Sequence, residues 1–252
     1  AAILMARLSK NLASIIGLPI LFFFAFSLVS NIALMRHIRL EQPAWTNVPP
    51  PPSAAGISLA FLGDRELAFR SSVLTLQNFG NMTGQIQALK DYNYTNLGKW
   101  FWMEDALNKQ SDYVPFLAAY YFGGTQNPHQ LYPVIDYLRV VGRYPGGEKW
   151  RWLGQAVFLA RHKLEDQQLA LELAEELATT YHAGMPAWPL QMKAIIASDM
   201  GEKEMAYDMM VEMLRTESDK MHPNEVNFML DYICNKILSP VQKGRDALCQ
   251  GQ

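Results

Sequence analysis

The chain has 252 residues, half of them apolar, which is enough to bury the core of one ordinary domain and carry an appendage. Its 22 basic and 24 acidic side chains leave a formal net charge of −2, which excludes binding to nucleic acid through an overall positive field. Its two cysteines exclude a disulfide-dense miniprotein and a zinc site built from four thiolates.

The N-terminal segment, residues 1–41, contains a long stretch without any charged side chain, residues 11–35. At about 1.5 Å of rise per residue, a helix of this length exceeds the roughly 30 Å hydrocarbon core of a bilayer. We therefore expect a single transmembrane helix at about 11–35. A cleaved signal peptide is the alternative, but no pattern of small residues precedes the charged cluster at residues 36–39.

Two features of this span bear on its use. The polar residues Ser27 and Asn31 are candidate contacts with neighbouring membrane helices, because polar groups within a bilayer seek partners. The orientation stays open, since Arg7 and Lys10 on one side balance Arg36 and Arg39 on the other.

Residues 42–56 form a proline-rich linker, with four consecutive prolines at Pro49–Pro52. Consecutive prolines favour the extended polyproline II conformation over helix or sheet. We expect a stiff spacer between the membrane helix and the body.

Residues 57–238 show apolar side chains at three- and four-residue spacing, interrupted by short breaks with Gly, Pro, Asn or Asp. This pattern predicts an all-α domain, followed by a C-terminal tail at 239–252. Asp64 has the side chain of a helix N-cap. The expected helices lie near 64–79, 95–109, 112–122, 129–142, 148–162, 165–181, 187–199, 202–216 and 222–238.

Small residues recur where paired helices must approach closely. Ala194, Gly201 and Ala206 occupy small, turn and small positions, and Ala170 and Ala174 stand in the preceding unit. This pattern resembles the tetratricopeptide (TPR) repeat, and residues 61–217 are similar to bacterial membrane-anchored TPR-like proteins with degenerate repeats. The resemblance implies an α-solenoid of helical hairpins that serves as an interaction scaffold. It names no partner and leaves the repeat count open.

Signatures of catalysis and of cofactor or metal binding are missing from the sequence. The five histidines are scattered, and there is neither a phosphate-binding glycine loop nor a nucleophile motif. The acidic residues Glu172, Glu175 and Glu176 are interpreted as the solvated face of an amphipathic helix. We expect no catalytic residue, no metal, no cofactor and no small-molecule substrate, and therefore not an enzyme.

Aromatic residues are the candidates for partner binding. Trp100, Phe101 and Trp102 are consecutive, and a helix rotates by about 100° per residue, so at least one of them is expected on a surface. Together with Tyr120 and Tyr121 they are the candidate anchors for a partner segment, while most of the other aromatic residues are expected in the core.

The cysteines bear on the cellular compartment. Cys234 lies late in the last predicted helix and Cys249 lies in the polar tail, at a separation that allows a disulfide. Two free thiols are the alternative, and the sequence does not choose between them. A bridge is expected only if the body is exported to an oxidising compartment.

Two functions fit these observations. The first is a non-enzymatic scaffold or adaptor that binds partner subunits of a larger membrane assembly through the TPR-like domain. The second is an accessory or assembly subunit of one membrane enzyme complex, contacting it mainly through the membrane helix. The expected partners are protein subunits and the lipid bilayer, with no nucleic acid. The expected location is the bacterial inner membrane, with the body on the periplasmic side.

Overall fold

The computed structural model of the chain describes residues 19–36, 47–80, 86–182 and 184–250. The first part of the predicted membrane span, residues 11–18, and the first part of the predicted linker, residues 42–46, lie outside the described residues. The chain divides into two compact units, Ala1–Trp45 and Thr46–Gln252.

The described part of the first unit is one helix, Pro19–Arg36. Its 18 residues rise about 27 Å, close to the thickness of a hydrocarbon core. All of its side chains are exposed within the unit, including four phenylalanines between Phe22 and Phe26. By length and composition this helix can cross a membrane.

The second unit, called the body below, contains helices and no strand among its described residues. Its α-helices are α2 (Ala54–Ala60), α3 (Arg65–Gln77), α4 (Tyr94–Leu107), α5 (Tyr113–Phe116), α6 (Tyr132–Val141), α7 (Trp150–His162), α8 (Gln167–Thr179), α9 (Trp188–Asp199), α10 (Lys203–Glu217), α11 (Pro223–Tyr232) and α12 (Pro240–Lys243). Two π-helical turns, η2 (Leu117–Tyr121) and η6 (Ile233–Ile237), continue α5 and α11.

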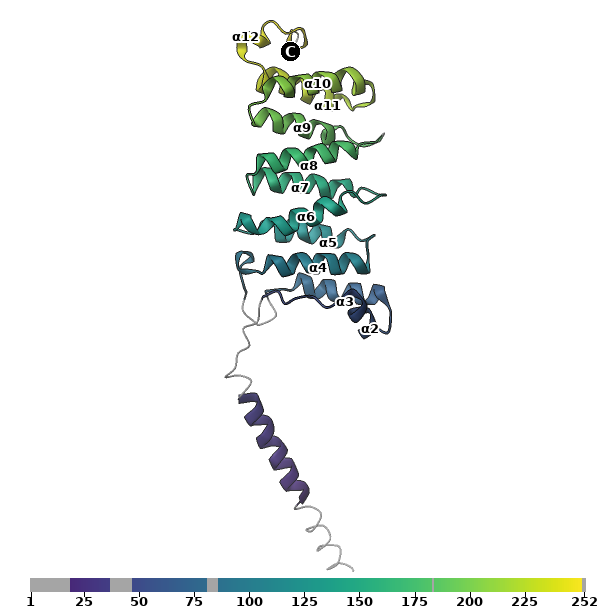
Figure 1. Ribbon diagram of the computed structural model, residues 1–252, viewed down its shortest axis with the longest axis vertical. Helices are drawn as coiled ribbons and strands as arrows, with labels where there is room; N and C mark the ends of the chain where they lie inside the picture. The colour runs from purple at the N-terminus through teal and green to yellow at the C-terminus, as the bar shows by residue number, and fades with distance from the viewer. Residues whose placement is uncertain (1–18, 37–46, 81–85, 183, 251–252) are drawn as a thin grey trace, which may run out of the picture. The chain divides into compact units, whose positions relative to one another are not determined.

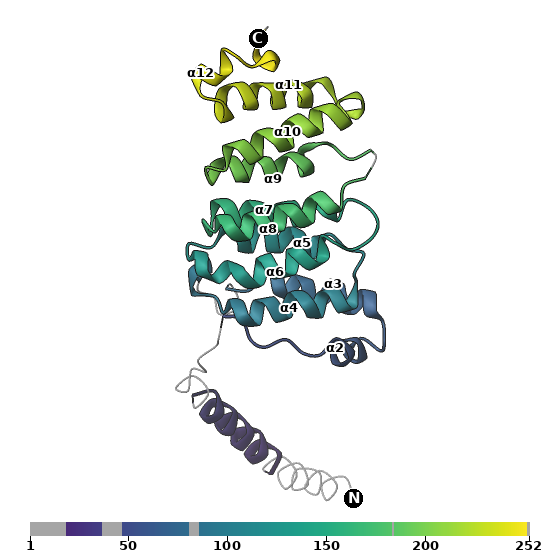
Figure 2. The ribbon, with the colours of Figure 1, turned by 45° about the horizontal axis from the view of Figure 1, so that its top comes forward.

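The helices of the body stack one after another as hairpins (Figures 1 and 2). Within the hairpins α7 packs on α8 and α9 on α10, and between hairpins α6 packs on α7 and α8 on α9. The predicted all-α fold with one N-terminal span and a solenoid of helical hairpins is confirmed. The predicted helices correspond to α3 through α11. Two short helices were not predicted: α2, whose first residues fall within the predicted linker, and α12, which lies in the predicted tail.

Helix starts follow from local side chains. The carboxylate or amide oxygens of Asp64, Asn93 and Asp166 each accept a hydrogen bond from the backbone N–H three residues later, at 2.9–3.0 Å. These bonds satisfy donors that the first turn of a helix leaves unpaired. At the start of α11, His222 Nδ1 accepts a hydrogen bond from the backbone N–H of Asn224 at 3.2 Å, and Glu225 Oε2 accepts one from the backbone N–H of His222 at 3.1 Å.

Small residues permit the close stacking. Gly142 at the end of α6 has an ordinary φ of −62°, so its role is not a left-handed turn. A Cβ there would lie 2.8 Å from Leu153 Cα and closer still to the Leu153 backbone nitrogen. Gly154 receives the ring of Trp188, whose Cη2 would lie 2.5 Å from an added Cβ. Ala206, on α10, is fully buried.

Residues 47–49, which lie within the predicted spacer, are already bonded to the helices of the body. Val48 is fully buried, and its carbonyl accepts a hydrogen bond from Asn96 Nδ2 at 3.0 Å. The carbonyl of Pro49 accepts one from Trp100 Nε1 at 2.7 Å, and Asn47 donates to the carbonyl of Asp91 at 2.7 Å. The prolines therefore begin in contact with the body, so the part of the predicted stiff linker from residue 47 onward is bonded to it at its start.

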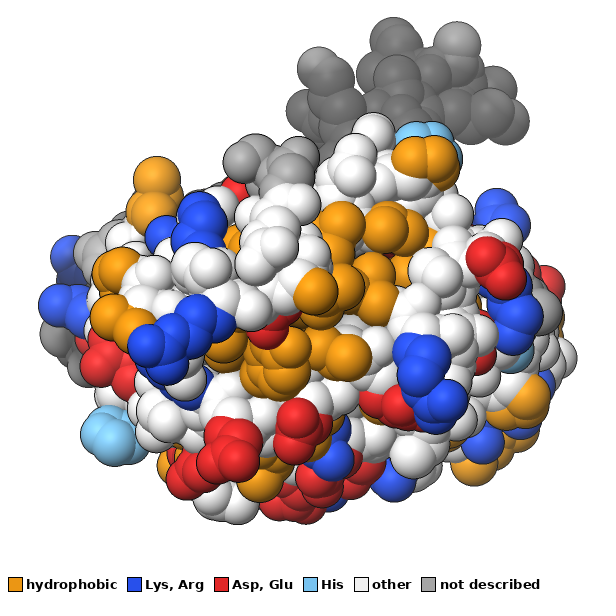
Figure 3. Space-filling model, turned by 90° about the horizontal axis from the view of Figure 1, so that it is seen from above, with side chains coloured by type: hydrophobic (Ala, Val, Ile, Leu, Met, Phe, Trp, Pro, Cys, Tyr) orange, Lys and Arg blue, Asp and Glu red, His pale blue; other side chains and the backbone are white. Residues whose placement is uncertain are grey.

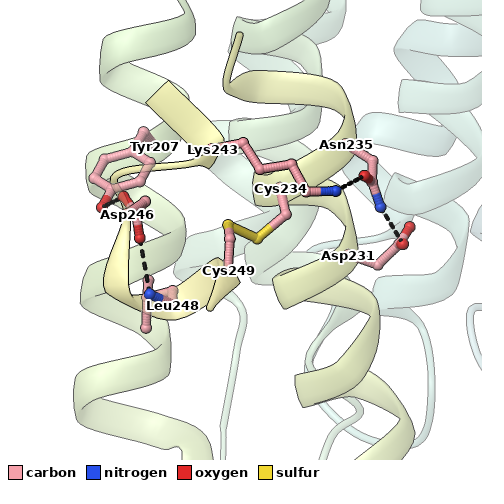
Figure 4. Close-up of a disulfide and its surroundings, with 8 residues drawn as sticks. All are labelled: Tyr207, Asp231, Cys234, Asn235, Lys243, Asp246, Leu248 and Cys249. Atoms are coloured by element: carbon pink, nitrogen blue, oxygen red, sulfur yellow. Dashed lines mark hydrogen bonds between the residues drawn. A yellow bond between two sulfur atoms is a disulfide. The ribbon is translucent and has the colours of Figure 1, made fainter. Parts of the chain in front are cut away.

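The C-terminal tail is tied to the last hairpin by a disulfide between Cys234 in η6 and Cys249 (Figure 4). Both cysteines are buried, with Cα atoms 5.8 Å apart. The same tail reaches α10, because Tyr207 donates its hydroxyl hydrogen to Asp246 Oδ2 at 2.6 Å. Of the two alternatives for the thiols, this structure contains the bridge.

A carboxyl group is completely buried in the core beside α3 and α4. Glu104 on α4 is fully buried, and its Oε2 lies 2.9 Å from Ser72 Oγ, which donates a hydrogen bond to it. Its Oε1 has no hydrogen-bond partner among the described residues. Burial raises the pKa of Glu104 to about 7, and the bond from Ser72 only partly offsets this.

Replacing Glu104 by Gln should change how stability depends on pH. This carboxyl group ionises near its ordinary pKa of 4.5 in the unfolded chain and near 7 in the folded chain, so the wild-type free energy of unfolding falls as pH rises between these values. At about 1.4 kcal/mol per pKa unit, the wild type should lose about 3 kcal/mol more than Glu104→Gln between pH 4 and 8. Urea titrations at several pH values measure this, and parallel curves for the two proteins would contradict it.

Gly142→Ala should destabilise the body, because the added Cβ meets the backbone of Leu153 and the helices must separate. We expect a loss of about 1–3 kcal/mol, measured by thermal and urea unfolding. Gly124→Ala is the matched control, since its Cβ would make one ordinary contact, at 3.9 Å with Leu89. Equal stability of the two variants would show that the close contact between α6 and α7 at Gly142 does not exclude a larger side chain.

Candidate protein-binding surface

The three consecutive aromatic residues of α4 divide between core and surface. Trp100 is buried with its ring 5.0 Å edge-on to Phe79, and Phe101 is completely buried. Both rings belong to the core of the body, so of the three only Trp102 is offered to a partner by this structure. Trp102 is 39% exposed, with its ring edge-on to Tyr137 at 5.1 Å.

Tyr120 and Tyr121 follow each other in η2 and are 57% and 42% exposed. Tyr120 contacts Phe116 at 5.2 Å on one side and Trp152 of α7 at 6.4 Å on the other, measured between ring centroids. Tyr121 instead packs edge-on against Phe122 at 4.9 Å. Only Tyr120 of the predicted residues therefore belongs to a larger group of rings, three of them exposed and one, Trp152, half-buried.

That group is named here the aromatic stripe and consists of Phe116, Tyr120, Trp152 and Phe158. It runs over α5, η2 and α7, and Phe116 and Phe158 are 48% and 46% exposed. The sequence pattern alone does not single out Phe158, since two of its three partners in the stripe, Phe116 and Tyr120, are distant along the chain.

A groove of about 450 Å³ lies beside the stripe, between η2 and α7. Its lining residues are Ala119, Tyr120, Gly123, Gly124, Gln155, Phe158, Leu159 and Lys163. Apolar walls with a few polar groups are typical of sites that take a partner side chain. Among the lining residues, Lys163 carries the one charged side chain.

Trp152 is held in place by a fixed charge pair. Its Nε1 donates to Asp112 Oδ1 at 2.7 Å, and Lys149 Nζ lies 2.8 Å from the same oxygen. Burial opposes ionisation of Asp112, but the hydrogen bonds from Lys149 and Trp152 outweigh it and lower the pKa of Asp112. Lys149 also donates to the carbonyl of Ser111 at 2.9 Å, which secures the turn before α5. The Trp152 ring is thus pre-positioned.

A second apolar area covers the C-terminal helices, where hydrophobic side chains gather in the view from that end of the body (Figure 3). The helices α10 and α11 fully bury only Ala206, Met210 and Met229. Phe228 is 44% exposed there. Most of the other apolar side chains are half-buried against this small core, so they serve packing first.

The remaining predicted residues lie apart from the aromatic stripe. Ser27 and Asn31 are exposed on the Pro19–Arg36 helix and, four residues apart, share one face.

Among the acidic residues of α8, Glu176 accepts hydrogen bonds from Arg139 Nε at 2.9 and 3.0 Å, and Glu175 lies 2.7 Å from Lys193. These carboxylates tie α8 to α6 and α9, a role beyond the solvated face that the sequence indicates.

No group of three or more potential ligands among the described residues could hold a metal ion. Comparisons of the chain with protein-family models, with curated proteins and with solved structures each gave no match.

Proposed function

We propose that this chain is a non-enzymatic, membrane-anchored scaffold that binds protein subunits of a larger membrane assembly through its TPR-like helical domain. The aromatic stripe is the observation that carries the proposal. Exposed, rigidly held aromatic side chains beside a groove are the typical anchors of protein interfaces. The anchor helix, long and apolar enough to cross a membrane, would keep this surface beside its partners.

The proposed location is the bacterial inner membrane, with the body on the periplasmic side. The disulfide supports this side, because bridges form and persist in oxidising compartments and are rare in the cytosol.

The alternative function is that of an accessory or assembly subunit of one membrane enzyme complex, bound mainly through its membrane helix. The shared face of Ser27 and Asn31 favours it, since two polar groups on one side of an apolar helix can bond a neighbouring helix. The two functions differ in which surface carries the binding energy.

Labelling of the cysteines tests the compartment. Membranes are isolated without reductant, the protein is denatured, and a thiol reagent is then added. We expect the reagent to label neither Cys234 nor Cys249 in this sample, and to label both in a second sample that is reduced first. Mass spectrometry counts the labels. Two labelled thiols without reduction would contradict both the bridge in cells and the exported orientation.

Co-purification after gentle detergent extraction tests the scaffold. Tyr120→Ala and Phe158→Ala should each weaken binding of the partner subunits about 30-fold, the effect of losing an anchor worth about 2 kcal/mol. Phe228→Ala is the matched control, because its ring is exposed to a similar extent, 44% against 46% for Phe158. The control should keep the partners.

The same measurement separates the alternative. Ser27→Leu and Asn31→Leu should leave co-purification unchanged if the body carries the binding. Loss of partners in these variants, with binding kept in the stripe variants, would replace the scaffold by the accessory subunit. Circular dichroism of each variant shows that it is folded.

A further inference from the structure

The first elements of the body expose large apolar side chains that nothing in the body covers. Leu59 in α2 is 74% exposed and Leu62, in the turn before α3, is fully exposed. Leu67 and Leu74 on α3 are 51% and 56% exposed. No residue of α2 is buried, and residues 42–63 carry no charged side chain.

The backbone holds Leu62 outward. Its φ is +55°, a left-handed conformation that a leucine seldom adopts. The turn is fixed by hydrogen bonds from Leu62 N to the carbonyl of Leu59 at 3.0 Å and from Gly63 N to the carbonyl of Ser58 at 2.9 Å. A strained, rigid turn that presents a fully exposed leucine needs an apolar environment outside the body to explain it.

Chain length limits where that environment lies. The anchor helix ends at Arg36 and the chain is hydrogen-bonded to the body from Asn47, so residues 37–46 are all that joins them. A chain of this length spans at most about 40 Å. It joins the body at the first hairpin, because Asn96 and Trp100 of α4 bind Val48 and Pro49, and α2 packs on that same helix.

We propose that the α2–α3 turn, with Leu59 and Leu62 at its tip, inserts into the surface layer of the bilayer that holds the anchor helix. The contact rests on the membrane anchoring in the proposed function and adds a second attachment point. The tip from Leu59 to Gly63 carries no charged side chain, and the first charged residue, Asp64, follows it directly. Such a tip suits a soft lipid surface, because shallow insertion needs no complementary cavity and buries only uncharged side chains.

Depth measurement on the full chain tests the contact. Leu62→Cys is spin-labelled, since the two native cysteines are bridged, and the protein is reconstituted in vesicles of phosphatidylcholine and phosphatidylglycerol. Relaxation by oxygen, which concentrates in lipid, is compared with relaxation by a water-soluble nickel chelate. Val241→Cys is the control, 66% exposed on α12 near the other end of the chain.

The label at Leu62 should lie about 5–10 Å below the headgroups, with oxygen the stronger relaxant, and the control should show the reverse. A Leu62 label as open to nickel as the control would overturn the contact. A label shielded from both reagents would overturn it in favour of a protein partner. Failure of the unlabelled full chain to float with vesicles would overturn the anchoring itself, which separates that failure from failure of the contact.

Discussion

The close approach of neighbouring helices through small residues is the constraint on which the body depends. A linear array of hairpins has no central core, so each helix is placed only by its neighbours. Gly142 lets α6 meet the backbone of Leu153. Gly123, two residues after η2, lets the chain approach Leu159, where an added Cβ would lie 3.1 Å from a side-chain carbon. The second approach also brings Tyr120 to Trp152, so the functional surface follows from the same packing rule.

Features set by neighbouring residues could be predicted from the sequence. Helix positions follow from apolar spacing, the start of α3 from Asp64, and the small interface residues from Ala194 and Ala206, which the structure buries completely. Each of these depends on contacts within a few residues or on a repeat period. These features can therefore be predicted without knowledge of the tertiary arrangement.

Features set by contacts between distant residues could not be predicted from the sequence. Which of Trp100, Phe101 and Trp102 faces outward depends on α3 and α6, and the spacing within α4 shows only that they diverge. The docking of Pro49 depends on a tryptophan in another helix. Four consecutive prolines indicate an extended chain, but they do not show that the first of them, Pro49, is bonded to the helical body. The stripe likewise joins residues of α5, η2 and α7, which no local pattern connects.

The disulfide has a consequence for how the array opens. In a stack of hairpins the end elements have one neighbour and fray first, which amide hydrogen exchange detects as a gradient of protection. The covalent link from η6 to the tail, with Asp246 bonded to Tyr207 of α10, removes the free end on that side. Local opening of η6 must then carry the tail with it, so exchange near Cys234 should be slowed while the bridge is intact.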